Sequence, residues 1–318
     1  VILKKKKIDD ILKKKSQEDF LFFIFNQYFK ENAYGYKFLF NCYYFLLFEN
    51  FFNSKKKFNK CFYLYENQSW ERSMTYNFKK KNPKSSVYGV IHSSLRYWDM
   101  RYFNLKKLIK NSKIRKFYNR NIILSSKSFL KLCITNNFSK DNLFLAETLR
   151  YENLFKKKNK VLILKNKANF KNSIIFIGDY DPHINSDIIK LINVLSSKNK
   201  FVLVYKPHPL QNFTSSSNFL PRSVVVTNDS IELLSEKYHN FIVSNTTTVG
   251  LELLIKKKNV ITILDNELIN FSPLKGLKYK NYMYELNEIY KQINKKSNFS
   301  NDLFLHNKTY KKWSKLLK

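Results

Sequence analysis

The chain has 318 residues, of which 44% are hydrophobic, so it can bury a real core in one large domain or two smaller ones. This excludes a disordered polycation despite a formal net charge of +34. Lysine supplies most of the 58 basic residues, whereas nucleic-acid-binding proteins favour arginine for bidentate contacts, so the charge does not indicate a nucleic-acid partner. It indicates an A+T-rich genome, and it would also suit contact with an anionic membrane, at about 1 kcal/mol per well-placed lysine.

Cysteine usage and apolar segments bear on the compartment. Cys42, Cys61 and Cys133 lack metal-ligand spacing, so we expect buried thiols in a reducing cytoplasm. Lys4–Lys7 are not followed by the apolar stretch of a secretory leader. The most apolar segment, Phe38–Phe48, is about half as long as a membrane span, which predicts a buried helix. The predicted location is therefore cytoplasmic, with peripheral contact at the inner membrane.

The N-terminal half has the pattern of a small α/β segment. The aromatic-rich stretch 18–52 contains two helical blocks separated near Asn32–Gly35. Strands are expected at 61–65 and 87–91, on either side of a helix at 70–79. The stretch 104–170 is less regular, and its expected elements are strands at 122–124 and 161–164 and a helix over 143–155.

From residue 173 strands and helices alternate regularly. The expected strands cover 174–177, 201–205, 223–226, 241–243 and 260–264, and the expected helices cover 184–197, stretches from Ser230 and Thr247, 280–293 and 308–317. This alternation specifies βαβ units and a doubly wound parallel sheet, so the fold class is α/β. Trp313 is expected to tether the last helix. The chain thus divides into a partial N-terminal α/β domain, 1–150, and a Rossmann-like C-terminal domain, 151–318.

Lys206-Pro207-His208-Pro209 follows the strand 201–205. The two prolines fix φ and remove backbone donors, so the loop keeps one shape. In an open parallel sheet, ligands bind outside the carboxyl ends of the strands. There His208 would donate to a phosphate or ribose oxygen, and Lys206 would supply charge. The alternative is an ordinary turn with a solvated lysine.

Ser244-Asn245-Thr246-Thr247-Thr248 follows the strand 241–243. A single hydroxyl is enough to cap the next helix, whereas a cluster of hydroxyls with free N–H groups at a helix start makes a phosphate site. Glu252, one turn later, is expected to accept hydrogen bonds from ribose hydroxyls. Its alternative is a solvated helix glutamate.

Gly178-Asp179-Tyr180-Asp181-Pro182 ends the strand 174–177. Gly178 would let a ligand approach the backbone beside Asp179. An Asp-x-Asp pair is also able to hold a divalent metal and a diphosphate. A proline-containing turn that caps the next helix explains the same residues better, so neither a metal site nor a cofactor is predicted.

Two residues of the N-terminal half are candidates for a general base. Glu66 follows the strand 61–65, and His92 follows the strand 87–91. A carboxylate or imidazole at a strand end is suited to taking a proton from an acceptor hydroxyl. Arg96, Asp99 and Arg101 come soon after His92, and a buried Arg-Asp-Trp cluster that packs the domain explains them at least as well as a catalytic role.

Together these stretches resemble bacterial surface-carbohydrate (O-antigen and capsule) biosynthesis proteins. The matching stretches are Tyr63–Glu71, His92–Phe103, Lys206–Pro209, Ser244–Thr248, Leu264-Asp265 and Asn270–Gly276. Such proteins look like GT-B glycosyltransferases, with two Rossmann-like domains. The His-Pro and Ser/Thr motifs are similar to those of bacterial sialyltransferases and of enzymes that transfer 3-deoxy-octulosonic acid, in which they hold the cytidine monophosphate of the donor.

The resemblance implies roles for individual residues. His208 and Lys206 would contact the donor phosphate or ribose. The other substrate-binding residues that it suggests are Gly178, Asp179, Pro209, Ser244, Asn245, Thr246, Thr247, Glu252 and Ser272. The first matching strand begins closer to the start of the chain than is usual for this fold, which implies a partial, truncated N-terminal domain.

The sequence therefore predicts an inverting, metal-independent glycosyltransferase, with a CMP-linked acidic sugar as donor and a saccharide or lipid-linked acceptor. His208 would act catalytically by stabilising the leaving phosphate. Other GT-B chemistry is a nearby alternative, either polyol-phosphate transfer or nucleotide-sugar epimerisation. A basic, non-enzymatic polyanion-binding protein and an inactive truncated chain are more distant alternatives.

Overall fold

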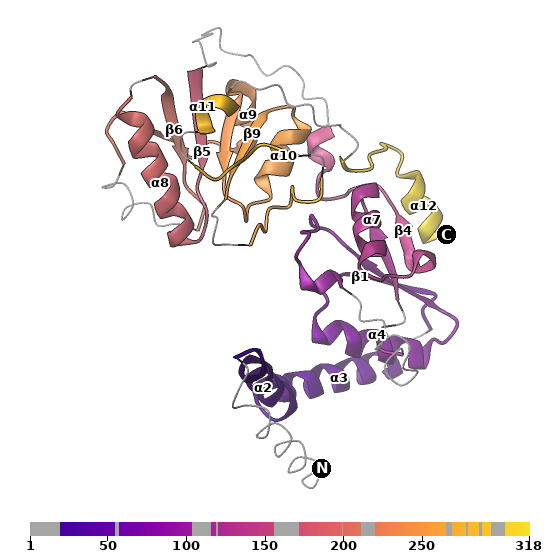
Figure 1. Cartoon of the computed structure of the whole chain (residues 1–318). Helices are drawn as coiled ribbons and strands as arrows, with labels where there is room; N and C mark the ends of the chain where they lie inside the picture. Colours follow the sequence, from indigo (N-terminus) through magenta and orange to yellow (C-terminus); the bar gives the residue numbers. More distant parts are fainter. Residues whose placement is uncertain are drawn as a thin grey trace. The chain divides into compact units, whose positions relative to one another are not determined.

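The computed structural model of the protein contains two parallel sheets (Figure 1). It describes residues 20–54, 57–103, 116–118, 120–155, 172–198, 200–210, 220–264, 269–277, 279–285, 288–293 and 303–318. The four-stranded sheet has the order β1-β2-β3-β4, and the six-stranded sheet has the order β10-β9-β8-β5-β6-β7. Two compact units comprise residues 1–90 with 105–121, and 91–104 with 122–318. The boundary after residue 150 falls between the two sheets and stays a prediction.

The first unit contains the expected helix pair and strand–helix–strand segment. Its elements are α2 (Phe20–Ala33), α3 (Tyr36–Ser54), β1 (Lys60–Leu64), α4 (Ser69–Lys81) and β2 (Ser86–Val90). Strands β1 and β2 pair in parallel along their whole length. Helix α3 packs on α4 through stacked rings, with Phe45 on Tyr76 and Phe48 on Trp70.

The prediction of a buried helix over Phe38–Phe48 is wrong. Phe52 is the only residue of α3 that is fully buried, because α4 covers one face of the helix and leaves the opposite face exposed. Among the described residues, no helix is both long enough and apolar enough to cross a bilayer. The thiol of Cys42, on α3, is likewise exposed rather than buried, whereas Cys133 is buried as expected.

The segment that follows the first unit's strands departs most from expectation. It comprises η1 (Met100–Tyr102), β3 (Asn121–Leu124), α7 (Lys127–Thr135), η2 (Lys140–Asn142), β4 (Leu143–Leu145) and η3 (Glu152–Phe155). The strand at 122–124 is confirmed. The helix over 143–155 is wrong, because Leu143–Leu145 pairs in parallel with β3. Helix α7 was missed, although Ser126 caps it by accepting a hydrogen bond from the N–H of Ser128 at 3.2 Å. The strand expected at 161–164 lies outside the described residues.

The six-stranded sheet confirms the predicted βαβ alternation. Its elements, with the helices that follow, are β5 (Ser173–Ile177), α8 (Pro182–Ser196), β6 (Val202–Lys206), β7 (Val225–Val226), α9 (Ile231–Lys237), β8 (Asn240–Val243), α10 (Val249–Ile255), β9 (Asn259–Ile263), β10 (Tyr282–Met283), α11 (Ile289–Gln292) and α12 (Lys311–Leu317). The chain runs from β5 to β7 on one side and then returns to β8 on the other side of β5. This is a doubly wound order with its switch point between β5 and β8.

The core of this sheet comes from its apolar strands and from the inward face of α8. Phe176, Ile192 and Ile242 are fully buried in one cluster. The single helix expected over 280–293 is wrong, because Tyr282–Met283 instead pairs in parallel with Thr262–Ile263 of β9. Helix α11 covers only the end of the expected range.

The tether at Trp313 is confirmed. Its indole N–H donates to the carbonyl oxygen of Glu147 at 2.8 Å. The carboxylate of Glu147, which is 3% exposed, accepts from the backbone N–H groups of Lys312 and Trp313. Because these N–H groups start α12 and have no partner within the helix, Glu147 caps it from the segment that follows β4.

Candidate functional site

The carboxyl ends of β5, β6 and β8 carry most of the predicted site residues. All three strands are parallel, and β5 lies between the other two. Ile177 pairs with Lys206, and Phe176 pairs with Ile242, so the three strands end at the same edge of the sheet. The structure therefore brings together three loops that are distant in sequence: 178–181, 206–210 and 244–248. Ligands bind at such a switch point in doubly wound sheets.

Asp179 joins two of the loops at this edge through its hydrogen bonds. It is 2% exposed, and its Oδ2 accepts hydrogen bonds from the hydroxyls of both Ser244 and Thr246. Its Oδ1 accepts from the N–H of Asp181 at 3.1 Å. A hydroxyl has one hydrogen to donate, so Ser244 and Thr246 direct theirs to Asp179 and offer a ligand only their lone pairs. Their predicted contact with a phosphate stays a prediction.

Three other groups at the same edge are better suited to bind an anion. The Nδ1 of His208 accepts from the N–H of Leu210 at 3.2 Å, so the neutral ring carries its proton on Nε2 and can donate it to a ligand. Thr247 Oγ1 accepts from the N–H of Val249 at 3.3 Å and keeps its own hydrogen. Lys206, the last residue of β6, has a half-buried side chain that ends in an ammonium group. Pro209, the next residue after His208, is exposed.

Gly178 lets the His208 loop approach the end of β5. Its N–H donates to the carbonyl oxygen of Lys206 at 2.8 Å. A Cβ at this position would lie 2.7 Å from the hydroxyl oxygen of Tyr205 and 3.2 Å from the backbone nitrogen of His208. The close contact that requires glycine is thus made by the protein's own loop, whereas the sequence predicted a ligand there.

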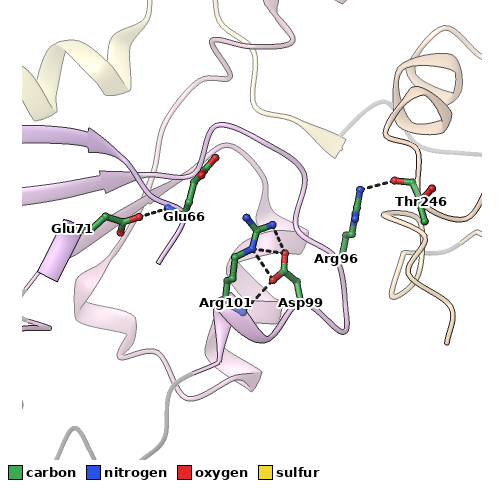
Figure 2. A network of polar contacts seen from close by, with 6 residues as sticks. All are labelled: Glu66, Glu71, Arg96, Asp99, Arg101 and Thr246. Atoms are coloured by element: carbon green, nitrogen blue, oxygen red, sulfur yellow. Dashed lines mark hydrogen bonds and ion pairs between the residues drawn. The ribbon is translucent and has the colours of Figure 1, made fainter. Parts of the chain in front are cut away.

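Two residues that support this edge were not predicted to do so. Asn185, 4% exposed, clamps the backbone of Asp179: its Oδ1 accepts from the N–H at 2.8 Å, and its Nδ2 donates to the carbonyl oxygen. The sequence offered one signal of this role, since Asn185 is an amide residue in the first turn of α8, on a helix face that is otherwise apolar. Arg96 Nη2 donates to the carbonyl oxygen of Thr246 at 2.5 Å (Figure 2). Asp99 and Arg101 instead pair with each other, at 2.7 Å, and because Trp98 and Arg101 are exposed, the expectation of a buried cluster is wrong.

The turn interpretation of the Asp-x-Asp pair is confirmed. Asp181 caps α8, since its side chain accepts from the N–H of His183 at 2.9 Å, and Pro182 occupies the first turn. Throughout the described part of the chain, no group of three or more His, Cys, Asp or Glu side chains is arranged to hold a metal ion.

Asn245, Ser272 and Glu252 lie in buried or half-buried surroundings. Asn245 Nδ2 donates to the carbonyl oxygen of Ile269 at 3.4 Å, and the hydroxyl of Ser272 accepts from the N–H of Leu274 at 3.2 Å. Both contacts fix the loop 269–274. Burial raises the pKa of Glu252, which lies within the short helix α10, and nearby Glu232 raises it further. The predicted contact of Glu252 with a nucleoside stays a prediction.

The two candidate bases belong to different units. His92 is half-buried in the second unit, directly after β2. Glu66 is half-buried in the first unit, and its backbone N–H donates to Oε1 of Glu71 at 2.7 Å (Figure 2). The same oxygen of Glu71 accepts from the N–H of Gln68 at 2.9 Å. Glu71 therefore fixes the loop that carries Glu66.

Glu71 has no exposed surface, and burial raises the pKa of its carboxyl group even though Arg120 lies 3.9 Å away. The folded state then holds the proton more tightly than the unfolded state. The resulting stabilisation is fully present below the unfolded pKa of about 4.3 and is lost as the pH rises through the folded pKa. We expect Glu71→Gln to remove this loss, because its amide oxygen still accepts both N–H groups. Urea unfolding, monitored by circular dichroism at a series of pH values from 4 upward, measures how the free energy of unfolding changes with pH.

Glu31→Gln is the matched control, since Glu31 is exposed and pairs with Lys37 on the surface. Its pH profile should follow that of the unsubstituted protein. If Glu71→Gln shows the same fall in stability with rising pH as the unsubstituted protein, Glu71 is not the group responsible.

Solved structures of other proteins match this chain. The UDP-GlcNAc 2-epimerase from Neisseria meningitidis, solved bound to UDP-GlcNAc, matches with a TM-score of 0.54 and 12% identity, over 87% of this chain and 81% of that chain. TarM matches with a TM-score of 0.46 and 14% identity, over 78% and 50% of the two chains. HepE of Anabaena in complex with UDP-glucose matches with a TM-score of 0.46 and 12% identity, over 78% and 71%. No family model and no curated protein sequence matches the chain. The likeness to the epimerase confirms the predicted GT-B-like α/β fold.

Proposed function

We propose that the protein is a glycosyltransferase of surface-polysaccharide biosynthesis that takes its sugar from a nucleotide-activated donor, a CMP-linked acidic sugar. The observation that carries the proposal is that β6, which leads into Lys206 and His208, and β8, which leads into Thr247, end at the same edge of a doubly wound sheet. This site offers an imidazole N–H, a hydroxyl and a cation, which are the groups that bind a phosphate. The GT-B-like fold is consistent with a nucleotide-sugar substrate.

The proposed reaction is a single displacement at the anomeric carbon. A base, Glu66 or His92, takes the proton of the acceptor hydroxyl, and the acceptor oxygen forms a bond to the anomeric carbon. The bond from that carbon to the phosphate oxygen breaks, and the electron pair leaves with the nucleotide. His208 Nε2–H and the ammonium of Lys206 stabilise the charge that develops on the leaving phosphate, which is where electrostatic catalysis acts most strongly.

A second candidate function is epimerisation of a UDP-sugar. It is favoured by the likeness to the epimerase solved with UDP-GlcNAc, at a TM-score of 0.54. At 12% identity that likeness extends to the fold and not to the chemistry. An epimerase would invert a sugar carbon and keep the bond to the nucleotide, so the two candidates differ in whether free nucleotide is released.

A nucleotide panel separates the candidates. In thermal unfolding with CMP, UDP and GDP, we expect CMP to raise the melting temperature most. A ligand at 100 times its Kd adds about 2.7 kcal/mol to the stability of the folded state, which corresponds to a rise of about 4 °C or more in a domain of this size. If UDP stabilises best and UDP-GlcNAc is converted to its 2-epimer without release of UDP, the protein is an epimerase.

The same assay tests the non-enzymatic alternative. A basic polyanion-binding protein would be stabilised equally by heparin, RNA and any nucleotide, and the effect would disappear at high salt. Equal stabilisation by all polyanions, with no preference among the nucleotides, would contradict the proposed function.

A further inference from the structure

The exposed face of α3 is apolar from Tyr36 to Leu46. Tyr36 is 71% exposed, Leu39 64%, Tyr43 59% and Leu46 56%. Their spacing of three or four residues places them on one side of the helix. A helix side this apolar is normally covered by protein or lipid.

This side is not the side that the fold uses. The opposite side of α3 packs on α4 through Phe45, Phe48 and Phe52, which contact Tyr76, Trp70 and Phe78 respectively. The packed side already fixes the helix within the first unit. The exposed side is therefore available to contact another surface.

The charges around α3 indicate what that surface is. In the sequence, Lys55–Lys57 follow the helix directly, and Lys79–Lys81 end α4. The two carboxylates between residues 20 and 65 are Glu31 and Glu49, and each pairs with a lysine, at 2.7 and 2.8 Å. Lysines that lie close to an apolar helix in the chain suit an anionic lipid surface.

A second copy of the chain fits this face less well. Two copies joined through α3 would bring the same lysine clusters together, and a chain with a formal net charge of +34 already repels itself. The exposed tyrosines also favour a bilayer, since an amphipathic ring with a hydroxyl is suited to the depth of the lipid headgroups.

We propose that α3 lies along the surface of a bilayer that contains anionic phospholipid, with Tyr36, Leu39, Tyr43 and Leu46 inserted between the headgroups. The lysines that flank α3 contact lipid phosphates, and α4 holds the helix on its other side. This inference does not rest on the proposed function, because it uses neither the edge of the six-stranded sheet that carries His208 nor a bound nucleotide.

Vesicle flotation of the full chain tests the proposal. We expect the chain to float with phosphatidylcholine vesicles that contain about one third phosphatidylglycerol, and to bind pure phosphatidylcholine at least tenfold more weakly. The triple variant Leu39→Ser, Tyr43→Ser, Leu46→Ser should lower binding to the anionic vesicles at least tenfold without a change in charge. A polarity-sensitive dye on the exposed thiol of Cys42 should shift to the blue when these vesicles are added.

The matched control is the triple variant Leu149→Ser, Val202→Ser, Leu317→Ser, whose side chains are 55%, 54% and 61% exposed elsewhere in the chain. It should bind anionic vesicles as the unsubstituted protein does. Equal binding by both triple variants overturns the proposal, as does failure of the unsubstituted protein to float. A dimer in light scattering that the α3 substitutions dissociate, without any vesicle binding, would assign the face to a second copy. Circular dichroism confirms that both variants are folded.

Discussion

Replacing His208 with alanine is expected to lower the rate of sugar transfer about 100-fold, with little effect on stability. The Nε2–H of His208 is the donor that its Nδ1 contact with Leu210 leaves for a ligand. Loss of one donor to a developing anion typically costs about two to three orders of magnitude in kcat. The side chain is half-buried in the loop after β6, with its ring centroid 6.2 Å from that of Tyr180, so its removal should change the free energy of unfolding by less than about 1 kcal/mol.

His239→Ala is the control for this prediction. His239 is also half-buried, but it directly precedes β8 and so lies at the amino ends of the strands, whereas His208 lies at their carboxyl ends. The transfer rate of both variants is measured as the release of nucleotide from the donor, quantified by chromatography. Equal activity in His208→Ala and His239→Ala would remove His208 from the mechanism.

Replacing Asp179 with alanine is expected to have the largest effect on the site as a whole. Its carboxylate accepts from Ser244, Thr246 and the N–H of Asp181, and all of these donors lose their partner at once. A buried donor without an acceptor costs about 1 to 3 kcal/mol, so we expect a loss of about 3 kcal/mol in the free energy of unfolding. Nucleotide binding should fall together with it, because loops 178–181 and 244–248 are no longer joined.

Urea unfolding and the nucleotide-induced rise in melting temperature report these two effects. Asp187→Ala is the matched control, since Asp187 is exposed on α8 and pairs at 2.9 Å with Lys190, and its loss should cost less than about 0.5 kcal/mol. Asp179→Asn retains one acceptor oxygen and should fall between the two. Unchanged nucleotide binding in Asp179→Ala would contradict the role of this carboxylate as the joint between the loops.

The sequence was most informative where local pattern and tertiary pairing agree. Strands β5, β6, β8 and β9 are apolar runs followed by polar turns, so their positions and their alternation with helices could be predicted. Because parallel strands end at one edge, the convergence of His208 with Ser244–Thr247 followed from the predicted sheet. The partners within that edge did not follow, since Asp179 reaches across 65 residues to Ser244 and no spacing rule links them.

Errors arose where pairing with another strand decides the structure. Leu143–Leu145 and Tyr282–Met283 are too short to show a strand period, and they are extended because β3 and β9 hold them. Helix α3 shows the opposite case. Its apolar character was visible in the sequence, but composition alone does not tell whether a partner covers a helix, and here one face is exposed.

The contact between Glu147 and α12 determines which fragments of the chain keep their native contacts. Glu147 follows β4, whereas Lys312 and Trp313 come after the whole six-stranded sheet, so α12 completes the surroundings of a carboxylate that lies much earlier in the chain. A fragment that stops between the sheets would lack both N–H donors to this carboxylate, at a cost of about 1 kcal/mol for each lost hydrogen bond. The N-terminal portion is therefore not a self-sufficient module, and the natural way to express its last strand is together with the C-terminal helix.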